Sequence, residues 1–326
     1  MRIATIASTA RYVPETEITN DALRRQFPPT KIDKLEAATG IKTRFAAPSS
    51  WAASDVALPA AKEALARAQV KPEDVDVVIV GTDTPDYITP ATSVVLQHKL
   101  GAKRAGTFDV GCACASFPTA VSIAAGLIAT NAWVKNVLVV GTYVMRKMAD
   151  PADPTVFFYG DGSGAAVLRA GDRPGFLSSA MLADGAYAQS WGIFAGGSAE
   201  PATEDAVRAG RTQVHLVDRY PPEVNDVGWP RLVRDMATRG GFGVQEIDMA
   251  IFTQVREGTI DKVMSTLELP MEKTHKIMQK WGYTGSACVA MALDDAIEQR
   301  LVKQGDLVVM VGSGVGYNQA GVALRL

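Results

Sequence analysis

The sequence predicts a layered α/β protein built from two similar halves. Strands that are apolar on both faces alternate with helices, which is typical of a sheet covered by helices on its two sides. The same succession of segments then recurs about half a chain later. The chain has 326 residues, too many for one small core, so we expect one large domain or two medium ones.

Short apolar runs and the helical spacing of apolar side chains locate the elements. Strands are predicted at 3–6, 75–80, 106–110, 137–140 and 164–168. Helices are predicted at 53–68, 92–100, 115–131 and 230–237. The helix at 115–131 is apolar nearly all round, which indicates a central helix buried between layers.

The recurrence joins two distant parts of the chain. The acidic turn and apolar strand at 73–80 have a counterpart at 245–252, a shift of 172 residues (73 to 245). The strand and glycine at 137–141 are echoed at 307–312. Chance likeness between α/β segments is the alternative explanation. A duplication would set two sheets against each other, with a site where the halves meet.

We therefore expect an N-terminal half, residues 1–170, and a C-terminal half, residues 171–326. The stretch 195–225 is rich in Gly, Pro and charge and lacks periodicity. It is predicted to be a long surface excursion, and loops of this length often serve as lids.

Composition excludes several classes of function. Thirty-three Lys and Arg stand against 35 Asp and Glu, a formal net charge of −2, which gives no long-range attraction to nucleic acid or anionic membranes. The N-terminal segment lacks the uninterrupted apolar core of a signal peptide, so no signal peptide is expected. No apolar run of about 18 residues is found in the sequence, so no membrane span is expected. The cysteines form no disulfide framework, and Cys112 and Cys114 lack zinc-ligand spacing. A cytoplasmic protein without a metal is expected.

Cys114 is the first candidate for chemistry. It lies between the strand at 106–110 and the helix at 115–131, where the helix dipole and free amides stabilise a thiolate. From position alone, a nucleophile and a small core residue are equally supported. Cys112 and Cys288 are assigned to packing. His98 and His275 are expected to be solvated.

Two glycine-rich stretches fail as nucleotide-binding motifs, because no helix follows the one at 160–164 or the one at 312–316. A dehydrogenase is therefore not predicted. The second stretch fits close backbone approach to a reacting carbonyl, with an amide that donates to an oxyanion.

Four motifs together resemble ketoacyl-ACP synthase III, the condensing enzyme that starts fatty-acid and some polyketide chains. They are the cysteine segment 108–117, the GDGSGAAVL stretch 160–168, the segment 282–287 and the closing glycine loop. The resemblance covers nearly the whole chain, including 81–90. It implies a thiolase-like duplicated five-layer αβαβα fold and usually a homodimer.

The resemblance also implies roles for single residues. Cys114 matches the acyl-accepting nucleophile, and the amides of Cys114 and Gly316 match the oxyanion donors. The family's His and Asn, which stabilise an enolate, correspond to Gln254 and Tyr283 here. Both can donate hydrogen bonds, but neither accepts a proton near pH 7.

Coenzyme A or the phosphopantetheine of an acyl carrier protein is the implied carrier of the substrate, with no permanent cofactor. The family's adenine clamp, a Trp and an Arg, is replaced by Lys34 and Ala38. Lys42 and Arg44 are candidates for binding its phosphates.

Docking of a carrier protein in this family uses a basic helix, for which Arg231, Arg234 and Arg239 are candidates. Alternatively, these arginines form a solvated helix face that binds no partner.

The sequence thus predicts an acyltransferase that loads an acyl group from a CoA or carrier-protein thioester onto Cys114 and passes it to a malonyl thioester. Two alternatives stay open. One is acyl transfer to an oxygen or nitrogen nucleophile without decarboxylation. The other is a non-catalytic binding or partner subunit.

Overall fold

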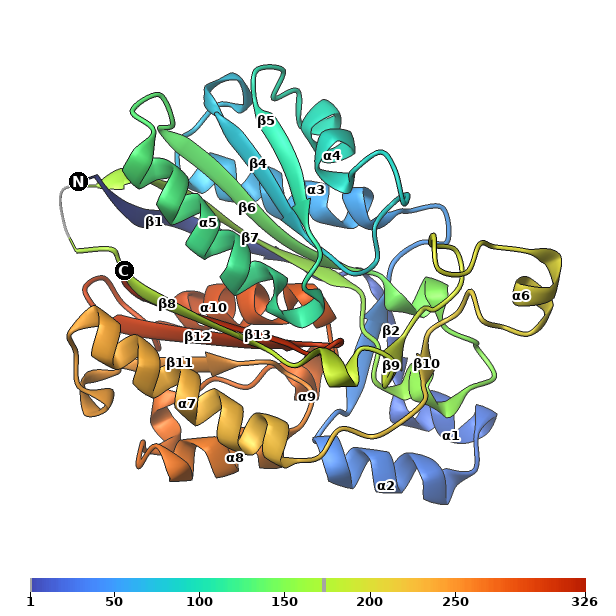
Figure 1. Ribbon diagram of the computed structural model, residues 1–326. Coiled ribbons are helices and arrows are strands. Elements are labelled where there is room, and N and C mark those ends of the chain that lie inside the picture. Colours follow the sequence, from blue (N-terminus) through green and yellow to red (C-terminus); the bar gives the residue numbers. More distant parts are fainter. Residues whose placement is uncertain (1, 172–173) are drawn as a thin grey trace.

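Two sheets enclose a pair of central helices in the computed structural model, which describes residues 2–171 and 174–326 (Figure 1). The first sheet has the order β1-β7-β6-β4-β5, and the second has the order β11-β12-β13-β8. In the first sheet β4 and β6 are parallel, whereas β6 and β7 are antiparallel. In the second sheet β11 and β12 are parallel, whereas β12 and β13 are antiparallel. The strands are β1 Ile3–Tyr12, β4 Val77–Gly81, β5 Gly106–Val110, β6 Asn136–Tyr143, β7 Gly162–Gly171, β8 Phe176–Ala183, β11 Met249–Phe252, β12 Leu307–Gly314 and β13 Asn318–Arg325.

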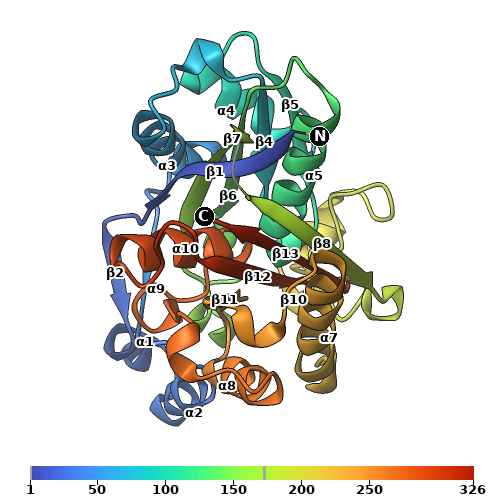
Figure 2. The same ribbon diagram turned by 90° about the vertical axis from the view of Figure 1, so that its left-hand side faces the viewer.

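Helices complete five layers. Two cover the outer face of the first sheet, two lie between the sheets, and two cover the outer face of the second sheet (Figures 1 and 2). In that order they are α3 Ala53–Arg67 and α4 Thr92–Leu100, α5 Ser116–Thr130 and α10 Cys288–Glu298, and α7 Glu223–Gly240 and α8 Glu257–Thr266. The predicted duplicated αβαβα fold is confirmed.

The two sheets repeat one another strand by strand. The order β1-β7-β6-β4 matches β8-β13-β12-β11, and Thr274 bridges Ala250 at the position that β5 has beside β4. A 3₁₀ turn precedes each central helix, Ala113–Ala115 before α5 and Gly285–Ala287 before α10. The strands of the first sheet come from 3–171 and those of the second from 176–325. A domain boundary at residue 170 stays a prediction.

Most predicted elements are present, with shifted ends. β1 continues to Tyr12 instead of ending at residue 6. α7 begins at Glu223 instead of residue 230, so Pro230 lies inside the helix. A proline inside a helix removes one backbone donor and crowds the preceding turn, but Pro230 is buried here together with Trp229 and Leu232, and this packing maintains the helix.

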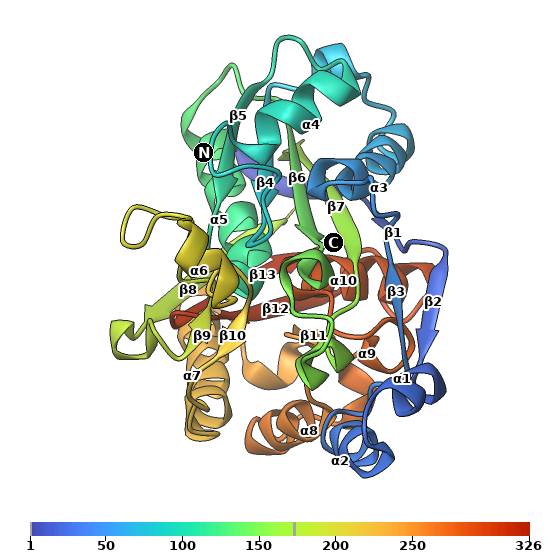
Figure 3. The same ribbon diagram turned by 90° about the vertical axis from the view of Figure 1, so that its right-hand side faces the viewer.

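Smaller elements surround the layers. The predicted excursion 195–225 contains a short helix and one strand of a small two-stranded sheet, and it lies at one side of the layers (Figure 3). A second group of elements precedes α3. The elements are β9 Trp191–Gly192, α6 Glu204–Arg208 and β10 His215–Leu216 in the first group, β2 Thr16–Thr19, α1 Asn20–Gln26, α2 Pro29–Thr39 and β3 Thr43–Ala46 in the second, and α9 Met278–Trp281.

Among the described residues, one helical segment, Ala113–Thr130, is long and apolar enough to cross a membrane by length and composition. The expectation that no such run exists is therefore wrong. The segment lies between the two sheets and 61% of it is buried, as is typical of a core helix.

Two glycines, which have no side chain, let the backbone at the start of each central helix contact a sheet strand directly. A Cβ added to Gly312 of β12 would lie 2.5 Å from the carbonyl oxygen of Cys114. A Cβ added to Gly141 of β6 would lie 2.5 Å from the carbonyl oxygen of Ser286. The glycine stretch at the end of the chain thus achieves a close approach, and its partner is the backbone of the cysteine turn.

Gly312→Ala should lower the free energy of unfolding by about 1–3 kcal/mol, because the backbone atoms that the new methyl meets cannot rotate away. Urea denaturation would measure the change. Gly258→Ala is the matched control, since nothing lies within 4 Å of that added Cβ on α8. Its stability should stay equal or rise slightly. Equal stability of both variants would contradict the close backbone contact.

Candidate active site

A cavity of about 180 Å³ lies at the start of α5, and we call it the chamber. Four of its side chains can donate or exchange protons, and the rest of the wall is apolar or backbone. The lining residues are Asp83, Cys114, Tyr143 and Tyr283 in the first group, and Met145, Trp191, Gly192, Ile193, Val214 and Val315 in the second.

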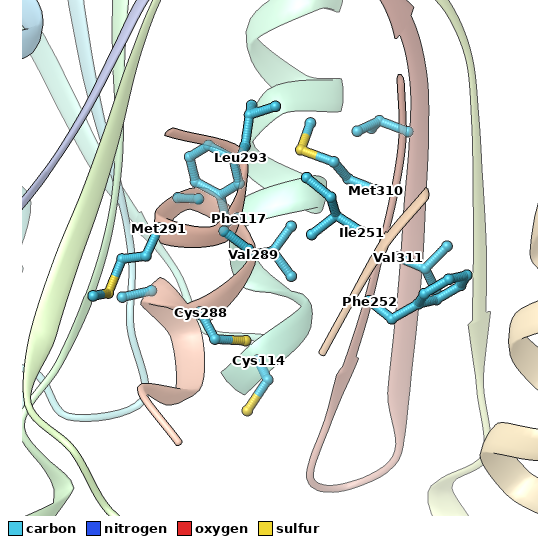
Figure 4. Close-up of a cluster of buried hydrophobic side chains, with 14 of the residues drawn as sticks. Cys114, Phe117, Ile251, Phe252, Cys288, Val289, Met291, Leu293, Met310 and Val311 are labelled. Atoms are coloured by element: carbon cyan, nitrogen blue, oxygen red, sulfur yellow. The ribbon is translucent and has the colours of Figure 1, made fainter. Parts of the chain in front are cut away.

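Cys114 reaches the chamber from the 3₁₀ turn between β5 and α5. Its side chain and that of Cys288 lie at neighbouring ends of the two central helices (Figure 4). Both are buried, and burial raises the pKa of Cys288 to about 12. Cys112 lines a separate hollow beside β8 and β13. Of the three cysteines, Cys114 alone faces the chamber.

Tyr283 contacts the nucleophile candidate directly, because its hydroxyl is hydrogen-bonded to the Cys114 Sγ. The Tyr143 ring packs against it, with ring centroids 5.8 Å apart. Burial raises the pKa of both phenols well above the usual range, so both are neutral hydroxyls at physiological pH. The structure therefore brings Tyr283 and Cys114 together.

The Cys114 thiol is protonated at neutral pH. Burial raises its pKa well above the ordinary value, and the Asp83 carboxylate and Cys288 raise it further. The hydrogen bond from Tyr283 acts in the opposite direction but is the smaller effect. Burial therefore opposes the stabilisation that a helix start gives to a thiolate, and the helix start is not the sole influence on this sulfur. A reaction in which this sulfur acts as a nucleophile would require a group that removes the proton.

Sequence reasoning missed Asp83. It follows the carboxyl end of β4, and its carboxylate accepts a hydrogen bond of 2.7 Å from the Ser286 hydroxyl. Burial raises the pKa of Asp83 to about 6, although this hydrogen bond lowers it. A signal was present: an acidic residue just beyond a fully apolar strand, on the sheet edge that also ends in the cysteine turn.

The Gln254 side chain does not reach the chamber, which corrects its expected role as a site donor. Its amide donates to the carbonyls of Phe252 at 2.8 Å and His275 at 3.1 Å, and its oxygen accepts from Ile277 N at 2.8 Å. These bonds hold the segment after α8 on the end of β11. The adjacent Thr253 hydroxyl accepts from the backbone N–H of Ser313.

All three histidines are described, and none lines the chamber. His98 is exposed as expected. His275 is instead part of an ion-pair cluster, with Nε2 2.7 Å from the buried Asp295. His215 contacts the carbonyl of Gly210 at 2.7 Å.

Arg44 is a core residue, which corrects its expected contact with phosphates. It has no exposed surface, and its guanidinium lies 4.7 Å from the centre of the Phe157 ring. Burial and the nearby Arg146 lower its pKa to about 9. Lys42 is exposed and stays a candidate.

The candidate docking arginines lie on the outer helix α7 and are exposed. Arg234 donates to the carbonyl of Thr266 and Arg239 to that of Ser179, both at 2.9 Å. Arg231 is 4.0 Å from Asp235. A charged face is present there, and its partner stays a prediction. Gly316 follows the chamber residue Val315 with a φ of +119°, and its oxyanion role also stays a prediction.

Comparisons with known proteins agree over the whole chain. The family model described as 3-oxoacyl-[acyl-carrier-protein (ACP)] synthase III matches residues 108–185, and the model of its C-terminal part matches residues 237–326. A relative named beta-ketoacyl-[acyl-carrier-protein] synthase III from Caldanaerobacter subterraneus is 35% identical, and the alignment covers 99% of this chain and 97% of that one. The relative of the same name from Symbiobacterium thermophilum is 36% identical over 98% and 97%.

Solved structures give the same result. The 3-oxoacyl-(acyl carrier protein) synthase III of Pseudomonas aeruginosa superimposes with a TM-score of 0.89 at 27% identity, covering 99% of this chain and 98% of that one. The priming beta-ketosynthase of the R1128 polyketide pathway has a TM-score of 0.91 at 29% identity, covering 100% and 96%.

Tyr283→Phe should raise the pKa of Cys114 further, because the hydroxyl that stabilises its thiolate is lost. Alkylation of Cys114 by iodoacetamide, followed by mass spectrometry from pH 6 to 10, should slow accordingly. Tyr159→Phe is the control, because that buried tyrosine has no contact with the sulfur and should leave the rate unchanged. A pH curve that is the same in Tyr283→Phe and wild type would contradict the contact.

Proposed function

The chain belongs to the 3-oxoacyl-[acyl-carrier-protein] synthase III family of condensing acyltransferases, and from this premise we propose that Cys114 carries the acyl group between donor and acceptor. The donor is the thioester of coenzyme A or of an acyl carrier protein. The acceptor is a malonyl thioester, whose decarboxylation supplies the carbon nucleophile.

One observation carries the proposal: a single buried thiol faces an apolar-walled chamber at the start of a helix, with a neutral hydroxyl bonded to it. Attack by Sγ on the thioester carbonyl creates an oxyanion. Backbone amides at the helix start and in the closing loop, at Cys114 and Gly316, would stabilise it. The apolar wall then receives the acyl chain, and the small volume favours short chains.

Tyr283 supports the condensation step as a neutral donor to the enolate oxygen that forms when carbon dioxide leaves. Because an enolate oxygen requires donors more than a base, decarboxylation does not depend on an imidazole. Acyl transfer to an oxygen or nitrogen nucleophile is the second candidate. It is favoured by the absence of a histidine from the described chamber wall.

Recognition of the carrier is assigned to exposed cations. Lys42 is the candidate for coenzyme A phosphates, and Arg231 and Arg234 are the candidates for an acidic carrier protein. We further propose a homodimer in a reducing, cytoplasmic compartment. The free edge of β5, the exposed Ile88 and three unpaired cysteines support this assignment.

The first test is intact mass after incubation with acyl-CoA thioesters of two to ten carbons and then with the matching carrier-protein thioesters. We expect a gain of one acyl mass in wild type and in Cys112→Ala, and none in Cys114→Ala. An adduct that persists in Cys114→Ala would overturn the assignment of the nucleophile.

Adding malonyl thioester to the acylated protein separates the two candidate reactions. Loss of the adduct together with a 3-oxoacyl product supports condensation. Loss only with hydroxyl or amine acceptors supports the second candidate. No adduct with any donor would leave a non-catalytic binding subunit as the better description.

A further inference from the structure

We propose that Asp83 is the proton acceptor for the Cys114 thiol during acyl transfer, in place of a histidine. The inference rests on the proposed acyl transfer at Cys114 and adds the group that makes it possible. Two observations favour such a group: the Cys114 sulfur is buried, which raises its pKa well above the ordinary value, and no imidazole lines the described chamber wall.

The geometry of the chamber favours Asp83 over the other groups that face it. Its carboxylate and the Cys114 sulfur share one cavity and interact electrostatically. Tyr143 and Tyr283 also line this cavity, and Cys288 interacts with Cys114 from outside it, but burial raises the pKa of all three well above that of a carboxyl. At neutral pH these three groups hold their protons, whereas Asp83 is free to accept one.

The second half of the fold positions the carboxylate. Ser286 occupies the 3₁₀ turn before α10 at the position that Cys114 has before α5, a shift of 172 residues (114 to 286). Its hydroxyl donates to Asp83 Oδ1 at 2.7 Å. One helix start therefore presents the nucleophile, and the equivalent helix start orients the base. Ser286 is a positioning residue.

The electrostatics suit an exchange of protons near neutrality. No cation contributes to the pKa of Asp83, which burial raises to about 6, so the carboxylate is ionised at pH 7 but is a stronger base than an exposed one. Below pH 6 it is protonated and cannot accept. Acyl loading should therefore fall as the pH drops through 6 and stay level above it.

The step balances as follows. The Cys114 proton passes to the Asp83 carboxylate, directly or through one hydroxyl or water of the chamber, while Sγ attacks the thioester carbonyl carbon. The tetrahedral intermediate collapses, the bond from that carbon to the donor sulfur breaks, and Asp83 returns the proton to the leaving thiolate. The products are acyl-Cys114 and the free thiol of the carrier.

The test compares pH profiles for iodoacetamide alkylation and for acyl loading, both in a Cys112→Ala background so that Cys114 is the one remaining thiol that lines a cavity. In wild type we expect an acid limb near pH 6 and a plateau above it, because transfer of the proton from thiol to carboxylate leaves the total charge unchanged. In Asp83→Asn the rate at pH 7 should fall about 100-fold or more and then rise tenfold with each pH unit.

Two further variants distinguish an effect on proton transfer from an effect on folding. Ser286→Ala removes a donor that stabilises the carboxylate, so the pKa of Asp83 rises and the acid limb should move to higher pH. Asp161→Asn is the matched control, because Asp161 is also buried with a pKa raised to about 6 but lies outside the chamber wall. Its profile should equal that of wild type. Ser286→Ala also keeps the test decisive if Asp83→Asn fails to fold.

An Asp83→Asn profile equal to wild type would overturn the inference. So would faster alkylation at pH 7, which is the result of deleting a negative charge that only repels the thiolate. A Ser286→Ala limb that stays at pH 6 would overturn it as well. Because alkylation needs no acyl donor, these outcomes are distinct from failure of the proposed function, in which wild type alkylates normally but accepts no acyl group.

Discussion

The direct contact of backbone with backbone at the centre of the molecule determines the rest of the structure. Each central helix begins against a strand glycine, Gly312 at the turn of Cys114 and Gly141 at the turn of Ser286. A side chain at either position would force a helix start away from its sheet. Because the two contacts are equivalent in the duplicated halves, both helix starts converge on one chamber.

This convergence divides the chemistry between the halves. The first half supplies the sulfur and a carboxylate, and the second supplies the phenol of Tyr283 and the Ser286 hydroxyl. Burial raises the pKa of the carboxyl, the thiol and the phenols that line the chamber, because it disfavours the charged form of each. The carboxylate is the group whose raised pKa still lies below neutrality, which is why it can exchange protons when the phenols cannot.

Much of this arrangement is visible in the sequence, and the missed parts have physical reasons. Periodicity and the repeat indicate the layers, and strand-to-helix position indicates Cys114. The contacts of Gln254 cannot be read from the sequence, because an amide two residues beyond the end of a strand can turn to the chamber or to backbone carbonyls. The burial of Arg44 depends on packing against Phe157, more than 100 residues later. The role of Asp83 becomes visible only in the folded protein, where Ser286 lies beside it.

One backbone hydrogen bond joins two segments of the chain that line the chamber. Val214, in the excursion, lines the cavity and donates its backbone N–H to the carbonyl of Met148 at 2.7 Å, three residues along the chain from Met145, which also lines the cavity. The excursion and the segment around Met145 are thus tied together through backbone and cannot separate freely. Widening the cavity between these two segments would cost this hydrogen bond, so the backbone as well as the side chains helps to set the size of the chamber.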